Sequence, residues 1–290
     1  MSNSKINKYV KLIFVFLIFN FWGCTAQNVA LQFDTNSKSD EIIFWYEQND
    51  NNEYLNLLRL KYPIDSLIRN AKTDTEKVVN ILNWVHRQWK HNGNNEPEKN
   101  DAISILEEVK DGKNFRCVEY GIVVAACLNS VGLKSRVLAL KTKDVETTKS
   151  GAGHVAAEVF INDLQKWVFI DPQFDAMPVL NGIPLNAVEL QNAIAENLDL
   201  LEIKSSITKK SKYTKWIYPY LYYFDVSFDN REGVKDKKLI DGKGSLMLVP
   251  LEAKNPTVFQ IRFPMNYLKY THSLEDFYKK PDKLINEKND

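Results

Sequence analysis

The sequence predicts an α+β fold, in which N-terminal helices pack on an antiparallel sheet and a β-rich extension follows. Between residues 73 and 131 apolar residues recur every three or four positions, which is the helical period. From Ser135 to Ile170 they form short runs separated by a turn signal, as consecutive antiparallel strands do. From Tyr218 to Phe263 the chain is aromatic and alternating again. Helices followed by strands is the α+β order.

Composition places the chain among folded globular proteins. It has 290 residues, of which 44% are hydrophobic and 12% aromatic, so it can bury a full core. Three lysines are the only charged residues before Cys24. The chain from Cys24 onward therefore has 35 basic and 37 acidic residues, a net charge of −2. No basic surplus remains for phosphates, so nucleic acid is not an expected partner.

Residues 1–23 read as a signal peptide, because three lysines precede an apolar run from Leu12 to Trp22 that is too short to span a bilayer. Phe21 to Cys24 resembles a bacterial lipoprotein cleavage box, although Phe21 and Trp22 depart from the usual residues. Cys24 would then carry the lipid, and the protein would be an exported, membrane-anchored lipoprotein of the cell envelope, on the periplasmic side or the cell surface. A plain signal-peptidase cut after Ala26 is the alternative.

The N-terminal half then predicts several helices. Residues 24–40 are polar and form a predicted tether, and Glu41 to Tyr62 suggests one or two helices that end near Pro63. A capping-box pattern at Thr73–Glu76 opens the next helix. Its apolar face carries Val78, Ile81, Leu82, Val85 and Trp89. A short amphipathic helix from Asp101 to Lys110 leads into a loop.

After this loop, Val118 to Val131 predicts an apolar helix that ends at Gly132. Cys117 therefore lies at a helix N-terminus, where unpaired N–H groups and the macrodipole favour a thiolate. Cys127 lies ten residues farther along this helix, or about 15 Å away, too far for a disulfide. We assign Cys127 to the core. A lone cysteine is most often a buried apolar residue too, so Cys117 needs further support.

That support comes from the strands. Ser135 to Leu140 predicts one strand, and after a polar segment His154–Ile161 and Lys166–Ile170 predict a hairpin. The hairpin would place His154 beside Asp171. Cysteine, histidine and aspartate then form a nucleophile, a base and a group that orients the base. We divide the chain into a core at residues 41–180 and an accessory helix and β-rich extension at 181–290, with the helix at Pro184–Leu198.

Three stretches resemble the transglutaminase-like superfamily, a papain-like Cys-His-Asp fold. They are Phe-Arg-Cys-Val-Glu-Tyr around Cys117, Gly-His-Val-Ala-Ala-Glu-Val around His154, and Lys-Trp-Val-Phe-Ile-Asp-Pro around Asp171. The first is most similar to the peptide:N-glycanase branch. The resemblance implies a catalytic triad that acts on amide bonds through a thioester. Ala156 is a departure from this family, in which an aromatic residue is common at that position after the histidine.

No glutamine precedes the cysteine as an oxyanion donor, so Trp84 and Gln88 are our candidates for that role. The expected substrate is a peptide, protein or glycopeptide, and no organic cofactor or metal is expected. His86 and His91 are five residues apart, which would place them on different faces of a helix, so we do not expect them to bind a metal together. The alternative function is a non-catalytic lipoprotein of the same fold that binds peptide or glycan, with the aromatic run Tyr218–Phe224 as a platform or, alternatively, as core.

Overall fold

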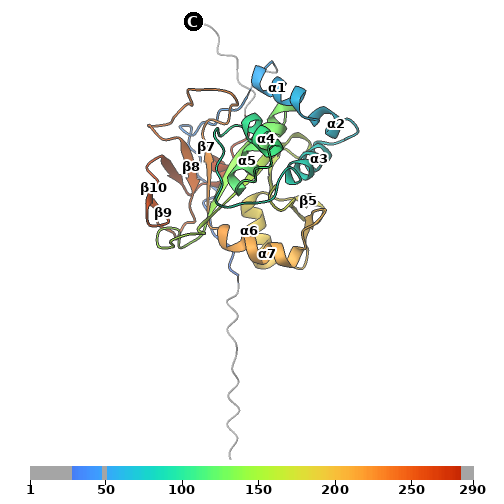
Figure 1. The fold of residues 1–290 in the computed structure, drawn as a ribbon. Helices are drawn as coiled ribbons and strands as arrows, with labels where there is room; N and C mark the ends of the chain where they lie inside the picture. Colours follow the sequence, from blue (N-terminus) through green and yellow to red (C-terminus); the bar gives the residue numbers. More distant parts are fainter. Residues whose placement is uncertain (1–27, 48–50, 282–290) are drawn as a thin grey trace, which may run out of the picture.

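The structure, a computed structural model, describes residues 28–47 and 51–281 and confirms the α+β fold. The predicted signal peptide and Cys24 lie outside the described residues. Figure 1 shows a central sheet with helices α1 to α5 on one side. None of the helices in the described ranges combines the length and apolar content needed to cross a bilayer.

Five helices form the first layer, in chain order: α1 (Glu53–Lys61), α2 (Ile64–Ile68), α3 (Asp74–His86), α4 (Ala102–Lys110) and α5 (Cys117–Ser130). Their ends follow local rules. Thr73 caps α3 by accepting a bond from the Glu76 amide, and Asp101 caps α4 in the same way. Gly132 follows α5 with a φ of 80°, as the sequence predicts. The helix predicted from residue 41 is wrong in its first part, because residues 41–47 form no helix.

The main sheet has six strands in the order β11-β8-β7-β1-β2-β3. They are β1 (Ser135–Lys141), β2 (Gly153–Ile161), β3 (Lys166–Ile170), β7 (Tyr223–Ser227), β8 (Ser245–Leu248) and β11 (Leu268–Thr271). All neighbours are antiparallel except the pair β11 and β8. The sheet therefore continues across residue 180, since β7, β8 and β11 extend the sheet formed by β1 to β3.

The rest of the chain forms two small sheets and further helices. The small sheets comprise β4 (Met177–Leu180), β5 (Ile183–Pro184) and β6 (Leu201–Lys204), and separately β9 (Val258–Phe259) and β10 (Phe263–Pro264). The helices are α6 (Ala187–Glu196), α7 (Lys210–Ile217) and α8 (Leu274–Phe277), with short 3-10 turns at Asn162–Leu164 and Tyr218–Tyr220. The sequence predicted α6 but not α7, α8 or β11.

Strand β2 separates two cores because its side chains alternate between the faces of the sheet. Ala157, Val159 and Ile161 are buried against α3, α4 and α5. Ala156 is buried on the opposite face, with apolar residues of α6, α7 and α8. Part of the predicted tether also packs here, since Phe33 is buried in the second core.

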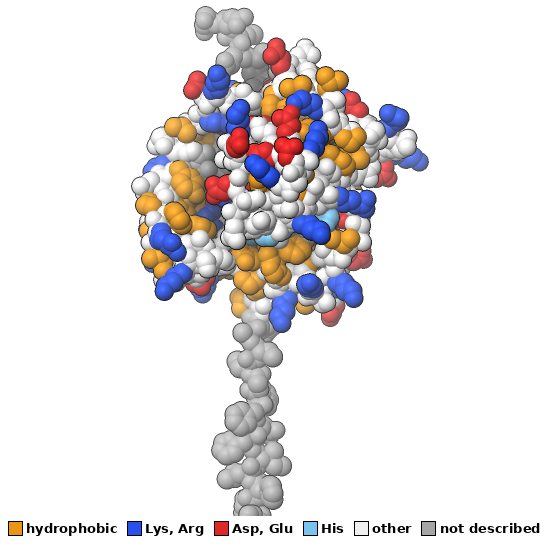
Figure 2. Space-filling view, viewed as in Figure 1, with side chains coloured by type: hydrophobic (Ala, Val, Ile, Leu, Met, Phe, Trp, Pro, Cys, Tyr) orange, Lys and Arg blue, Asp and Glu red, His pale blue; other side chains and the backbone are white. Residues whose placement is uncertain are grey.

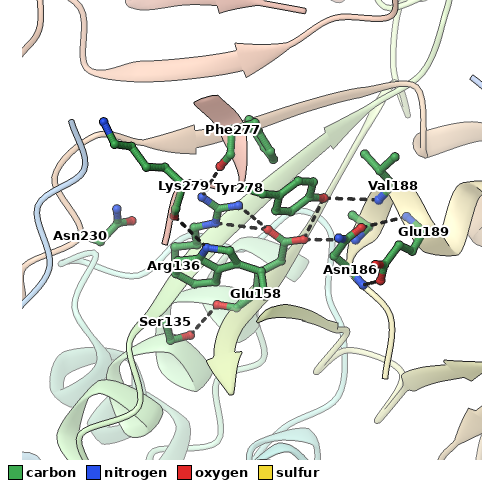
Figure 3. A network of polar contacts seen from close by, with 12 residues as sticks. Ser135, Arg136, Glu158, Asn186, Val188, Glu189, Asn230, Phe277, Tyr278 and Lys279 are labelled. Atoms are coloured by element: carbon green, nitrogen blue, oxygen red, sulfur yellow. Dashed lines mark hydrogen bonds and ion pairs between the residues drawn. The ribbon is translucent and has the colours of Figure 1, made fainter. Parts of the chain in front are cut away.

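A buried ion pair lies on this second face (Figure 3). Arg136 of β1 and Glu158 of β2 are both fully buried, with Nη2 2.7 Å from Oε2. The other carboxylate oxygen of Glu158 accepts bonds from the Ala187 amide and the Tyr278 hydroxyl, and Arg136 donates to the Phe277 carbonyl. Because each polar group has partners, this pair holds the sheet, the start of α6 and the C-terminal segment together.

Candidate active site

Helix α5 begins at Cys117, in a first turn that is held firmly. Arg116 is extended at the N-cap position, and its amide donates to Glu119 Oε2 at 2.9 Å. The Arg116 guanidinium also pairs with Glu119, whose side chain is fully buried. Glu119 is thus paired with Arg116 and is held away from Cys117 chemistry by that pairing. Cys117 is partly exposed, whereas Cys127 is buried in the core as predicted.

Glycine 121 sets the distance between α5 and the strand that carries His154. A Cβ on Gly121 would lie 2.9 Å from a Val155 methyl and 3.0 Å from the Ala156 carbonyl oxygen. Only a residue without a side chain allows this approach. The first turn of α5 is therefore brought to the beginning of β2, where His154 lies.

His154 is buried and its Nε2 lies 2.9 Å from Asp171 Oδ2. Its other ring nitrogen remains for Cys117, which lines the same cleft. Burial acts to lower the pKa of His154, but the charge and hydrogen bond of Asp171, together with hydrogen bonding and charge from Cys117, outweigh it and raise the pKa to about 9. An imidazolium at neutral pH is the partner that a thiolate requires.

Asp171 follows β3 directly and is fully buried. Its backbone pairs with Ala176, and its Oδ1 accepts from the Gln173 amide at 3.1 Å. Oδ2 accepts a second bond, from the Tyr213 hydroxyl at 3.0 Å. Tyr213 of α7 is fully buried and was missed in the sequence. The signal available there was the apolar spacing of Tyr213, Trp216 and Ile217, which predicts a helix face but no partner.

Aromatic rings surround the imidazole. Trp216 meets it edge-on, with centroids 4.8 Å apart and an interplanar angle of 84°. Tyr220 and Phe174 lie at 5.9 and 6.4 Å. Tyr220 comes from the predicted aromatic run, while Phe224 of that run is fully buried in the core. These rings limit the space in which the imidazole can turn.

Cys117 and His154 belong to the lining of a cleft of about 240 Å3. Its lining includes Cys117, Val118, His154, Val155, Phe259 and Tyr267. A larger hollow of about 630 Å3, lined by His91, Gln173, Phe174, Lys209, Lys212 and Tyr213, lies on the Asp171 side. The first cleft thus leaves room beside the partly exposed Cys117 for a ligand of modest size.

The two oxyanion candidates do not line this cleft. The Gln88 amide donates to the Trp84 carbonyl at 2.7 Å, and the Trp84 ring packs against Tyr62 with centroids 6.1 Å apart. The Cys117 amide is a first-turn N–H, which has no acceptor within the helix and lies beside the sulfur. Within the described ranges, no group of three or more metal-ligating side chains comes together.

The family model of the transglutaminase-like superfamily matches residues 64–172. This segment contains Cys117, His154 and Asp171, so the match agrees with the resemblance found in the sequence. The match does not test the nearer similarity to the peptide:N-glycanase branch, which stays a prediction. No curated protein matches the chain.

Several solved structures are similar at low identity. A candidate cysteine protease from Cytophaga hutchinsonii is 12% identical, with a TM-score of 0.35, over 60% of this chain and 56% of that one. Red sea bream transglutaminase is 15% identical, with a TM-score of 0.30, over 60% and 31%. A candidate protease from Parabacteroides distasonis is 16% identical, with a TM-score of 0.28, over 41% and 22%. The chain spans little more than half of the first protein and under a third of the others.

Proposed function

We propose that this protein is a cysteine enzyme that cleaves or transfers amide-type bonds of peptides, proteins or glycopeptides through a thioester. The observation that carries the proposal is the placement of three side chains. Cys117 at the start of α5 shares a cleft with His154, and His154 is bonded to buried Asp171. This arrangement supplies a nucleophile, a proton carrier and a group that orients the carrier.

The chemistry follows from these positions. The Cys117 thiolate attacks the carbonyl carbon, the C–N bond breaks, and the His154 imidazolium gives its proton to the departing amine. Water or a second amine then attacks the thioester carbon and loses a proton to His154. The C–S bond breaks, the acid or the new amide is released, and the thiolate–imidazolium pair is restored. Asp171 keeps the ring oriented throughout. The Cys117 amide can donate to the carbonyl oxygen as it gains charge.

Iodoacetamide tests the nucleophile directly. The folded protein should be alkylated at Cys117 at neutral pH, while Cys127 remains unmodified because burial raises the pKa of its thiol. Peptide mapping distinguishes the two sites within one sample. A His154→Ala variant should lose the rapid reaction. If Cys117 in the folded protein reacts no faster than in denaturant, the proposal is wrong.

The alternative is the non-catalytic lipoprotein that binds peptide or glycan. A panel of peptides and glycopeptides distinguishes the two functions, since an enzyme releases an amine in a Cys117-dependent manner. Binding that survives Cys117→Ala, without product from the unmodified chain, would favour the alternative.

We also propose an exported protein anchored in the cell envelope through a lipid on Cys24. Labelling of cells with radioactive palmitate should mark the protein and should fail to mark a Cys24→Ser variant. Equal labelling of both would exclude this anchor, and cleavage after Ala26 would leave neither labelled.

A further inference from the structure

A short hairpin from the C-terminal part of the chain forms one wall of the Cys117 cleft. Strands β9 and β10 pair through Phe259 and Phe263, and Phe259 lines the cleft together with Tyr267. These residues lie outside the segment matched by the family model, which ends at residue 172. Figure 2, in the view of Figure 1, shows apolar side chains exposed over β9 and β10.

The hairpin is fixed to the segment that leads to His154. The Gln260 amide donates to the Val145 carbonyl at 2.8 Å, and Gln260 Oε1 accepts from the Ala152 amide at 3.0 Å. Gln260 and Ile261 have φ angles of 50° and 66°. A β-branched residue such as Ile261 rarely adopts this left-handed conformation, so surrounding contacts must maintain it. The wall is therefore preformed.

Phe259 reaches the cleft because the residue before His154 is glycine. A Cβ on Gly153 would lie 3.0 Å from Phe259 Cζ and 3.1 Å from Cε2. The ring thus packs directly on the backbone of Gly153, the residue before His154 in the chain. Because Phe259 and Cys117 line the same cleft, a substrate that presents its carbonyl to the sulfur would place the neighbouring side chain near this ring.

The cleft offers apolar surface and little free charge. Val118, Val155, Phe259 and Tyr267 contribute to its lining. Lys141 also lines it, but its ammonium is buried and paired with Asp225. A charged substrate side chain would lose its hydration here without gaining a free partner, whereas an apolar one would be favoured.

We infer that the cleft is an acyl-donor subsite that selects a bulky apolar side chain on the residue whose carbonyl is attacked, with Phe259 as the specificity-determining residue. The inference rests on the proposed function and names its substrate class. The volume of about 240 Å3 is below that of pockets for drug-sized ligands, so it suits a single aromatic or branched aliphatic group.

Two aldehydes test the inference on the full chain. The Cys117 sulfur adds to the aldehyde carbon, and the oxygen takes the proton from His154, so each forms a reversible thiohemiacetal without a leaving group. N-acetyl-phenylalaninal carries the apolar side chain, and N-acetyl-glycinal lacks it. Protection of Cys117 from iodoacetamide measures the dissociation constant of each aldehyde. The ratio of the two constants measures the selectivity.

The unmodified protein should bind the phenylalanine aldehyde at least about tenfold more tightly than the glycine aldehyde. Phe259→Ala should reduce this ratio toward one, and Phe259→Leu should retain part of it. Leu251→Ala is the control, because Leu251 is an apolar residue of the C-terminal part that is 51% exposed and outside the cleft lining. It should leave the ratio unchanged.

Each other outcome overturns a defined claim. A ratio near one in the unmodified protein, or an equal fall in Phe259→Ala and Leu251→Ala, overturns the apolar subsite while the nucleophile stands. Failure of iodoacetamide to label Cys117 without any aldehyde overturns the proposed function itself. Melting curves of each variant show whether it is folded, and Phe259→Leu supplies the answer if Phe259→Ala is not.

Discussion

Replacing Tyr213 with phenylalanine removes one hydrogen bond to the carboxylate that orients His154. The hydroxyl lies 3.0 Å from Asp171 Oδ2, and both side chains are fully buried, so water cannot replace it. A hydrogen bond to a charged group contributes about 1.5–3 kcal/mol to the free energy of unfolding. For a domain of this size the melting temperature should fall by roughly 3–12 °C.

The same change should slow alkylation of Cys117. Asp171 orients His154, and it would itself have one hydrogen-bond partner fewer. If the loss of this bond raises the activation free energy of alkylation by about 1.4 kcal/mol, the alkylation rate falls about tenfold. Calorimetry gives the melting temperature, and iodoacetamide kinetics at 25 °C give the rate. Tyr222→Phe is the control, since Tyr222 is only partly buried and its ring packs against Tyr223 and not beside Asp171. Unchanged melting and unchanged labelling in Tyr213→Phe would refute the reasoning.

Three further predictions concern pH, the buried ion pair and the helix–strand contact. The pKa of about 9 for His154 keeps its ring protonated below that pH, so kcat/KM for amide cleavage should decline above pH 9. Asp171→Asn should move this decline to lower pH. Glu158→Gln should lower the free energy of unfolding, measured in urea, by about 3–5 kcal/mol, because Arg136 stays buried without its counter-charge. Glu275→Gln, at an exposed position, should change the free energy of unfolding little. Gly121→Ala should cost about 1–3 kcal/mol and slow Cys117 labelling by pushing α5 from β2; normal stability would contradict the close contact.

The placement of Cys117, His154 and Asp171 in the fold could be predicted because local structure determines each position. Cys117 begins a helix with a clear apolar run and a glycine after its end. His154 lies on β2 and Asp171 directly follows β3, and a short turn joins these two strands. The helix-to-hairpin order then leaves few ways to pack. Tyr213 could not be predicted in this way, because 42 residues separate it from Asp171 and no motif connects them.

Long-range pairing also explains the errors in the fold. A helix was expected from residue 41, but the Trp45 amide donates to the Phe228 carbonyl and the Asn230 amide donates to the Trp45 carbonyl. These distant bonds outweigh local preference. Gln88 illustrates the limit for side chains, since its position one turn after Trp84 lets its amide bond to that residue's carbonyl instead of the cleft.

The ion pair of Arg136 and Glu158 has a consequence for the order in which the polypeptide can mature. Its last partners, the Phe277 carbonyl and the Tyr278 hydroxyl, are among the final described residues to be synthesised. Until they emerge, the nascent molecule holds two opposite charges in an unfinished interior. A chain truncated before Phe277 should therefore be recognised by cellular quality control, although Cys117, His154 and Asp171 are all present.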